Sequence, residues 1–248
     1  MRTCIFVQKI ANELCFRRII KMTFAERFTQ NFIDEQRYMY LLKGLGSTIT
    51  ITIFAVLLGV LLGFLVAIVR TTHEKSGNLK ILDALCNLYL TIIRGTPVMV
   101  QLLIMFYVIF ASSTNKLLVA ILTFGINSGA YVAEIVRSGI QSIDNGQFEA
   151  GRSLGFTHAQ TMRLIIIPQA IKNVLPALMN ELIVLLKETS VCGYIGLMDL
   201  TKGGDIIRSR TYEAFLPLIA VAIIYLVIVC GLQSLAKRVE RRLRANER

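Results

Sequence analysis

The chain has 248 residues, of which 54% are hydrophobic and 17% charged, and it carries a formal net charge of +11 with a mean hydropathy of +0.61. Soluble domains carry about 25% charged residues, so this chain lacks the polar surface that a soluble globule needs. Its five cysteines are scattered and form no C-x-x-C, unlike a disulfide framework or a zinc site. The composition excludes a soluble enzyme, a secreted disulfide scaffold and a nucleic-acid binder, and it predicts an all-α, polytopic membrane helical bundle.

Residues 1–43 are expected to form an N-terminal extension and an amphipathic lead-in. Residues 1–21 are basic throughout and lack the uninterrupted apolar core of a secretory signal peptide. Phe24, Phe28 and Phe32 then recur at helical spacing, which is typical of a helix lying in the membrane interface.

Five apolar segments follow, each close to the ~20 residues that a helix needs to cross a bilayer core. The first carries Gly59-x-x-x-Gly63, a spacing of small residues that lets another helix approach closely. We expect a transmembrane domain over residues 44–236 and a basic tail over 237–248. The expected spans are about 45–69, 91–115, 117–136, 164–187 and 213–236.

Five spans place the two ends of the chain on opposite sides of the membrane. Because short loops on the cytoplasmic side are rich in Lys and Arg, the basic tail predicts a cytoplasmic C-terminus and an external N-terminus. Counting the Lys and Arg assigned to each side favours this orientation by 14 to 12. If translation began at Met22, the count would become 14 to 7, so residues 1–21 are interpreted as an extension or a wrongly assigned start.

The longest polar interval between expected spans, residues 137–163, lies on the same side as the tail. Asp144 followed by Gln147, and Thr157 followed by Gln160, are capping-box patterns that open a helix. The interval is therefore expected to hold two short helices outside the bilayer.

The first of these two helices combines a clear end with small side chains. Gly155 is expected to end it, because glycine tolerates the left-handed conformation at a C-terminal cap. Ala150 and Gly151 let the surface of another protein come close to the backbone.

This interval resembles the EAA loop of ABC importer permeases, whose pattern is Glu-Ala-Ala, three residues, Gly, nine residues and Ile-x-Leu-Pro. Gly151 replaces the second Ala and Ile167 replaces the Leu. In that family the loop is a coupling helix that docks on the ATP-binding subunit. The residues in register are Glu149, Ala150, Gly155, Ile165 and Pro168. The residues that the resemblance assigns to the ATPase contact are Gly146, Phe148, Glu149, Ala150, Gly151, Ser153, Leu154 and Gly155.

Three further segments resemble permeases for polar amino acids, and the likeness extends over about residues 40–240. They are Ile93-Arg-Gly-Thr-Pro-Val-Met-Val-Gln101, Ser128-Gly-Ala-Tyr-Val-Ala-Glu-Ile-Val-Arg137 and Leu186-Lys-Glu-Thr-Ser190. Thr96 is expected to cap a helix whose first turn holds Pro97. Arg94 then lies at the cytoplasmic edge, where phosphate headgroups solvate it.

The resemblance implies the membrane-spanning permease subunit of an ABC importer in the bacterial cytoplasmic membrane. Its implied partners are an ATP-binding subunit dimer, a second permease subunit (identical or paralogous), an external solute-binding protein, the lipid bilayer and an amino-acid substrate. The chain contains no G-x-x-x-x-G-K-[ST], the loop that cradles nucleotide phosphates. It is therefore expected to be no enzyme and to hold no cofactor, with ATP and Mg²⁺ on the partner ATPase.

An ionisable residue inside a span is costly and is therefore a functional candidate. Glu181 lies 13 residues beyond Pro168, or roughly 20 Å along a helix, and its carboxylate suits the ammonium group of an amino acid. An equal alternative is that it pairs with a neighbouring helix or is protonated. The candidate residues of the substrate path are Glu181, Asn180, Thr48, Gln101 and Asn127, with Ser47, Thr50, Thr52 and Ser128 as weaker candidates.

A different class of function remains open from the sequence. A secondary transporter or channel driven by an ion gradient would use Glu181 as an intramembrane acid. The sequence leaves undecided which amino acid is carried and whether the pore is a homodimer or a heterodimer.

Overall fold

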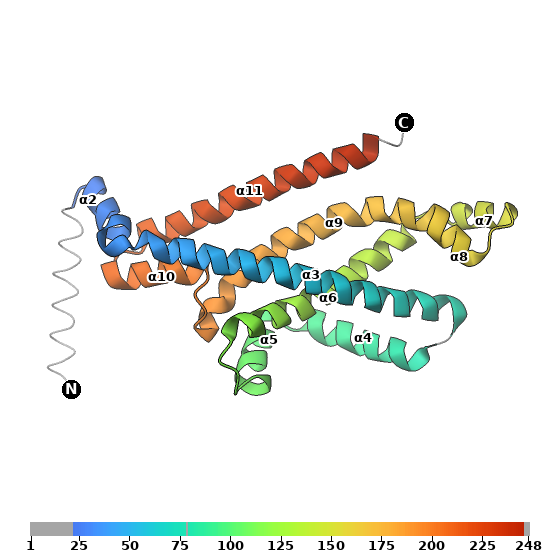
Figure 1. The fold of residues 1–248 in the computed structure, drawn as a ribbon, viewed down its shortest axis with the longest axis horizontal. Helices are drawn as coiled ribbons and strands as arrows, with labels where there is room; N and C mark the ends of the chain where they lie inside the picture. The colour runs from blue at the N-terminus through green and yellow to red at the C-terminus, as the bar shows by residue number, and fades with distance from the viewer. Residues whose placement is uncertain (1–21, 78, 246–248) are drawn as a thin grey trace. The chain divides into compact units, whose positions relative to one another are not determined.

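The computed structural model describes residues 22–77 and 79–245, and within this part of the chain it contains helices and turns but no strand (Figure 1). The expectation about residues 1–21 falls outside the described residues. The elements are α2 (Phe24–Phe28), η1 (Thr29–Ile33), η2 (Asp34–Gln36), α3 (Tyr38–Ser76), α4 (Lys80–Gly95), α5 (Val98–Ile104), η3 (Met105–Ile109), α6 (Lys116–Gln141), α7 (Asn145–Ser153), α8 (His158–Thr161), η4 (Met162–Ile166), α9 (Ile167–Glu188), η5 (Thr189–Ile195), α10 (Leu200–Thr211) and α11 (Phe215–Ala245).

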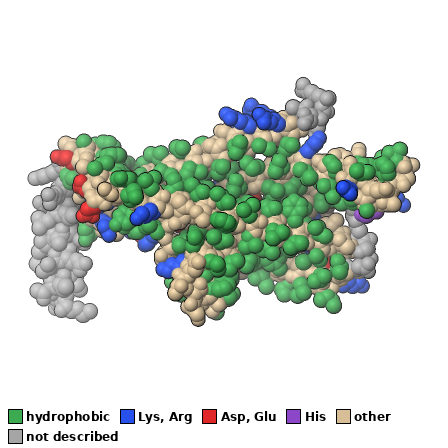
Figure 2. Space-filling model, in the orientation of Figure 1, with side chains coloured by type: hydrophobic (Ala, Val, Ile, Leu, Met, Phe, Trp, Pro, Cys, Tyr) green, Lys and Arg blue, Asp and Glu red, His purple; other side chains and the backbone are tan. Residues whose placement is uncertain are grey.

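The predicted all-α membrane bundle is confirmed. In the described residues, four helical segments are long and apolar enough to cross a membrane, and a bent pair of helices makes up to five spans. Hydrophobic side chains cover most of the face shown in Figure 2, as is required where lipid replaces water as the solvent. The four single spans are Tyr38–Glu74, Lys116–Gln141, His158–Ile195 and Phe215–Leu243.

The second expected span, 91–115, is wrong as a continuous helix. The chain bends by 108° between α4 and the segment Val98–Ile109. Thr96 and Pro97 are both extended there, because proline has no N–H to donate and disfavours helix in the residue before it. Pro97 is the N-cap of α5, without a side-chain cap. The expected Thr96 cap is therefore also wrong; its hydroxyl donates instead to the Ile92 carbonyl at 2.8 Å.

Two helices extend beyond their expected spans. α3 begins at Tyr38, inside the segment expected to be a lead-in. α11 continues to Ala245 through most of the basic tail. Lys237 and Arg241 are exposed at i, i+4 spacing there, and blue side chains gather at this end of α11 in Figure 2. Helical hydrogen bonding continues into the polar part of α11, since nothing in its sequence stops the helix.

The chain divides into two compact units. Among the described residues, the first comprises 22–48 and 190–227, and the second comprises 49–77, 79–189 and 228–245. In the first unit, the carbonyl of Tyr40 lies close to Gly203, so α10 packs tightly on the start of α3. Its described apolar core is Phe32, Leu41, Leu200, Ile207, Leu216 and Val221.

The second unit is held together where glycines allow helices to approach. A Cβ placed on Gly59 would lie 2.8 Å from the Cβ of Ser128, and one on Gly63 would lie 2.6 Å from the Cβ of Val132. The predicted close approach at this glycine pair is thus confirmed, with α6 as the neighbour of α3. α6 also packs along α9, so α6 lies between two long helices and carries the largest share of buried residues.

Candidate functional site

The carboxyl group of Glu181 lies inside the second unit, on the face of α9 that packs against α6. Glu181 is 9% exposed and Ser128 is fully buried. The Ser128 hydroxyl donates a hydrogen bond of 2.9 Å to Oε1 of Glu181. Glu181 is therefore paired with a residue of the neighbouring helix.

A polar cavity of about 550 Å³ opens in front of Glu181. One arginine and two glutamates line it, so the carboxylate and the ammonium group of an amino acid could each lie near a side chain of opposite charge. Its volume falls within the ~300–1,000 Å³ of small-molecule sites. We call this cavity the vestibule. The polar residues that line it are Arg94, Tyr131, Glu134, Ser138, Ser142, Asn173 and Glu181.

Glu134 is the centre of an ion network at one wall of the vestibule. Its Oε1 lies 3.1 Å from Nη1 of Arg70 and 3.5 Å from Nη1 of Arg94, and its Oε2 lies 4.0 Å from Arg137. Arg70 also reaches Asp83 at 3.6 Å. The network ties the ends of α3, α4 and α6 together and places Arg94 in an ion pair rather than only among headgroups.

The other predicted residues of the substrate path are not gathered at Glu181. Nδ2 of Asn127 donates to Oε1 of Gln101 at 3.0 Å, and Nε2 of Gln101 donates to the Ile93 carbonyl at 2.7 Å. This pair fastens the bend between α4 and α5. Thr48 belongs to the first unit, where its hydroxyl accepts from the Leu200 amide at 3.2 Å. Asn180 is exposed and does not line the vestibule.

The predicted two-helix loop is present as α7 and α8. Asp144 caps α7, but its side chain accepts from the Gly146 amide at 2.8 Å, and Gln147 instead accepts from Gln169. Thr157 and Gln160 form the reciprocal capping box that the sequence predicts. Gly155 has φ +80°, so it ends α7 in the left-handed conformation as expected.

One face of α7 is exposed along its whole length. Its residues follow the i, i+3, i+4, i+7 spacing of a single helix face, and the face ends at Leu154, which is 72% exposed. The small side chains of Gly146, Ala150 and Ser153 leave room on this face for a contact with another protein. We call it the outward face of α7. Its residues are Gly146, Glu149, Ala150, Ser153 and Leu154.

Two residues assigned to the ATPase contact lie on the inner side of the loop. Gly151 is buried, and a Cβ there would lie 2.6 Å from Cγ2 of Thr161, so its small size serves the packing of α7 on α8. Phe148 is half-buried, and its ring stacks on His158 at 6.5 Å between centroids. Both residues pack within the loop in this structure, and their contact with the ATPase stays a prediction.

The sequence analysis missed Arg70 and Glu134 as site residues. Glu134 stands in the segment 128–137 that carried the resemblance, and Arg70 stands at the end of the first apolar window. A signal was available, because an ionisable residue at the end of a span tends to find an opposite charge on a neighbouring helix. Among the described residues, no group of three or more His, Cys, Asp or Glu side chains is placed to hold a metal ion.

Comparison with known proteins gives concordant results. Residues 59–245 match the family described as binding-protein-dependent transport system inner membrane component. The chain is 36% identical over 213 residues to the putative glutamine transport system permease protein GlnP of Rickettsia typhi, covering 85% of this chain and 95% of that one. It is 34% identical to the arginine transport system permease protein ArtQ of Bacillus subtilis, covering 84% and 94%.

A solved structure described as an amino acid ABC transporter with histidines is 43% identical in sequence, with a TM-score of 0.78, covering 85% of this chain and 98% of that one. An inward-facing structure of the MetNI methionine ABC transporter shares the fold, with a TM-score of 0.71 at 22% identity.

Proposed function

This chain belongs to the family of binding-protein-dependent transport system inner membrane components, and from that premise we propose that it carries a polar amino acid into the cytoplasm, driven by ATP hydrolysis on a separate subunit. The ABC permease family works with an ATP-binding subunit and a solute-binding protein. We assign the ATP-binding subunit to the outward face of α7. A second permease subunit, identical or paralogous, completes the pore, and ATP with Mg²⁺ stays on the partner.

The observation that carries the proposal is the outward face of α7. A short helix outside the spans presents a carboxylate at Glu149, small residues beside it and Leu154 at its end. α8 and η4 join this helix directly to α9, which carries Glu181. A displacement of α7 is therefore transmitted to the wall of the vestibule. Closure of the nucleotide-bound ATPases then switches the spans between outward and inward access.

In this account Glu181 receives the ammonium group of the amino acid inside the vestibule. The Ser128 hydroxyl fixes the orientation of the carboxylate, and Arg94 and Glu134 lie on the path beyond it. An α-ammonium is shared by basic, neutral and sulfur-containing amino acids, so the carboxylate alone sets the class and not the individual substrate. The chain lies in the bacterial inner membrane, and we place its N-terminus outside and its C-terminus in the cytoplasm.

The contact with an ATPase is tested by purifying the tagged chain from membranes of its host and identifying the proteins that co-elute. We expect an ATP-binding subunit to co-elute with the unmodified chain and to be lost with Glu149→Lys. Gln147→Lys is the matched control, because Gln147 is exposed on the same helix, accepts a hydrogen bond from Gln169, and lies two positions from Glu149, on the opposite side of the helix from that carboxylate. Absence of an ATP-binding subunit from the unmodified chain, or its retention by Glu149→Lys, overturns the assignment.

A further inference from the structure

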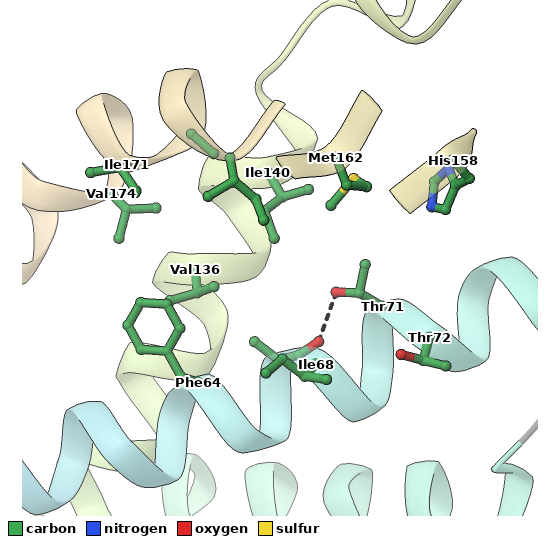
Figure 3. Close-up of a pocket in the computed structure, with 13 residues that line it drawn as sticks. Phe64, Ile68, Thr71, Thr72, Val136, Ile140, His158, Met162, Ile171 and Val174 are labelled. Carbon is green, nitrogen blue, oxygen red and sulfur yellow. Dashed lines mark hydrogen bonds between the residues drawn. The ribbon is translucent and has the colours of Figure 1, made fainter. Parts of the chain in front are cut away.

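A second hollow of the second unit lies apart from the vestibule and is walled almost entirely by apolar side chains (Figure 3). Its volume is about 450 Å³. Phe64 and Ile68 of α3 form one wall, and Ile171 and Val174 of α9 form the wall facing it. We call this hollow the apolar groove.

The few polar side chains that line the apolar groove either form a hydrogen bond within their own helix or lie at one end of the groove. The Thr71 hydroxyl donates to the Ala67 carbonyl at 2.7 Å, so it is satisfied within its own helix. Thr72 and His158 both line one end, beyond Ile68 and Met162 (Figure 3). A cavity with this lining offers water too few partners, and a polar amino acid is equally unsuited to it.

The mouth of the apolar groove is continuous with a surface that meets hydrocarbon. α3 and α9 both belong to candidate membrane spans. The side chains of Ile68 and Ile171, on its two walls, are 60% and 51% exposed. In a membrane these side chains contact acyl chains, so an acyl chain is the molecule that reaches the groove first.

The polar end of the groove suits a phosphate group. His158 also lines an adjoining cavity of about 340 Å³, and Arg152 lines that same cavity. A guanidinium group binds phosphate through paired hydrogen bonds. The positive charge of Arg152 therefore lies near the His158 end of the groove. A lipid with its tail in the groove would have its headgroup at this end.

We propose that the apolar groove binds one acyl chain of a membrane phospholipid, with the tail between Phe64 and Val174 and the phosphate end at Thr72 and His158. The bound lipid contacts α3 on one side and, through His158 and Met162, the loop that holds α7 on the other. The proposal depends on the chain spanning a membrane and not on its assignment to an ATP-driven importer.

The test uses the full chain, with whatever subunits co-purify, in vesicles of phosphatidylethanolamine and phosphatidylglycerol that contain a phosphatidylglycerol with a photoreactive diazirine in its acyl chain. After irradiation and digestion, mass spectrometry locates the labelled peptides. We expect peptides covering 64–72 and 167–174 to be labelled about tenfold more than the peptide with Leu226 and Val227, a preference that corresponds to about 1.4 kcal/mol. Those two side chains are 61% and 64% exposed and report bulk lipid.

Variants separate bound lipid from bulk lipid. Ile68→Trp and Ile171→Trp enlarge exposed side chains on the two walls, and each is expected to lower groove labelling about tenfold. Leu65→Trp is the control, since it adds the same bulk on α3 at nearly the same depth but outside the groove. Equal labelling of groove and bulk peptides, or no loss in either groove variant, overturns the proposal. So does a photoreactive amino acid at position 68 that cross-links to a second copy or another protein chain instead of lipid.

Discussion

Ser128 of α6 and Glu181 of α9 are joined by a hydrogen bond between their side chains, with 2.9 Å between the hydroxyl oxygen and Oε1 of the carboxylate. The contact exists because Gly59 leaves room for α3 to press against Ser128 from the other side. The carboxylate of Glu181 is thereby oriented at the wall of the vestibule by a group that is itself fully buried.

Replacing Glu181 by Gln is expected to raise the KM for amino-acid uptake about 10- to 100-fold, since a hydrogen bond to a charged group contributes about 1.5–3 kcal/mol. Ser128→Ala, which removes only the orienting hydroxyl, is expected to act more weakly. Uptake of radiolabelled amino acids into vesicles that contain the complete transporter measures both. Asn180→Ala is the control, because Asn180 is exposed and outside the vestibule. Unaltered uptake by Glu181→Gln would remove Glu181 from the path.

Replacing Gly63 by Ala is expected to lower the free energy of unfolding by about 1–3 kcal/mol, the usual cost of overpacking. The new Cβ would lie 2.9 Å from the amide nitrogen of Ala133, which cannot move alone because it is backbone. Gly46→Ala on the same helix has no atom within 4 Å of its Cβ. It is therefore expected to be neutral or to stabilise by up to ~1 kcal/mol through helix propensity. The melting temperature in detergent compares the two, and equal melting temperatures would contradict the close packing.

Replacing Glu134 by Gln is expected to destabilise the second unit by about 1–3 kcal/mol, because Arg70, Arg94 and Arg137 then face one another without their shared carboxylate. The cost is less than the 3–5 kcal/mol of a fully buried pair, since 29% of the Glu134 side chain is exposed and salt screens it. Glu74→Gln is the matched variant: among the residues that the structure describes, Glu74 forms an ion pair only with Arg137, and its side chain is 39% exposed. Thermal unfolding at low and high salt should show a larger loss for Glu134→Gln, reduced by salt.

The stability of the first unit is expected to fall as the pH rises from about 4 to about 6. Burial raises the pKa of Asp199 from 3.8 to about 6, against hydrogen bonds that favour its charged form, such as that from the Lys202 amide. Between these pH values the folded chain keeps a proton on Asp199 that the unfolded chain has already released. The contribution of this proton to the free energy of unfolding is therefore complete below about pH 4 and is lost as the pH rises to about 6. The difference corresponds to at most about 3 kcal/mol at 1.36 kcal/mol per pKa unit.

Asp199→Asn tests this pH dependence without removing the helix cap, because asparagine caps helices as well as aspartate does. The variant is expected to be more stable than the unmodified chain at pH 7 and to lose the slope between pH 4 and pH 6. A melting temperature that still falls across that range in Asp199→Asn would assign the slope to another group.

Local sequence rules predicted much of the fold correctly. The capping box at Thr157 and the left-handed turn at Gly155 were predictable because each depends on residues within one turn of the chain. The family was equally predictable, since the register from Glu149 to Pro168 is local, and the comparison with known proteins confirms it. The bend after Gly95 was missed because the apolar run continues on both sides of Pro97, so the pattern of hydrophobicity alone indicates one span.

Contacts between distant segments were beyond the sequence. Gln101 and Asn127 were grouped with Glu181 as polar residues in apolar helices, but they bind one another, and Gln101 also donates to the Ile93 carbonyl and to Thr96. Gly151 was expected to face a partner protein because glycine permits close approach on any side. The side that is approached is set by Thr161, ten residues later in the chain. Which neighbour a side chain contacts depends on the rotation of its helix about the helix axis. The spacing of residues in the sequence shows which side chains share a face, but not which neighbour that face meets.

The central claim, that ATP hydrolysis on a partner drives transport through the outward face of α7, is tested most directly by uptake into vesicles. The complete transporter, purified with the subunits that co-elute with this chain, is supplied with a panel of radiolabelled polar amino acids, with and without enclosed ATP. We predict accumulation that requires ATP and is abolished by Glu149→Lys but not by Gln147→Lys. Accumulation by this chain alone, driven by an ion gradient without ATP, would contradict the account.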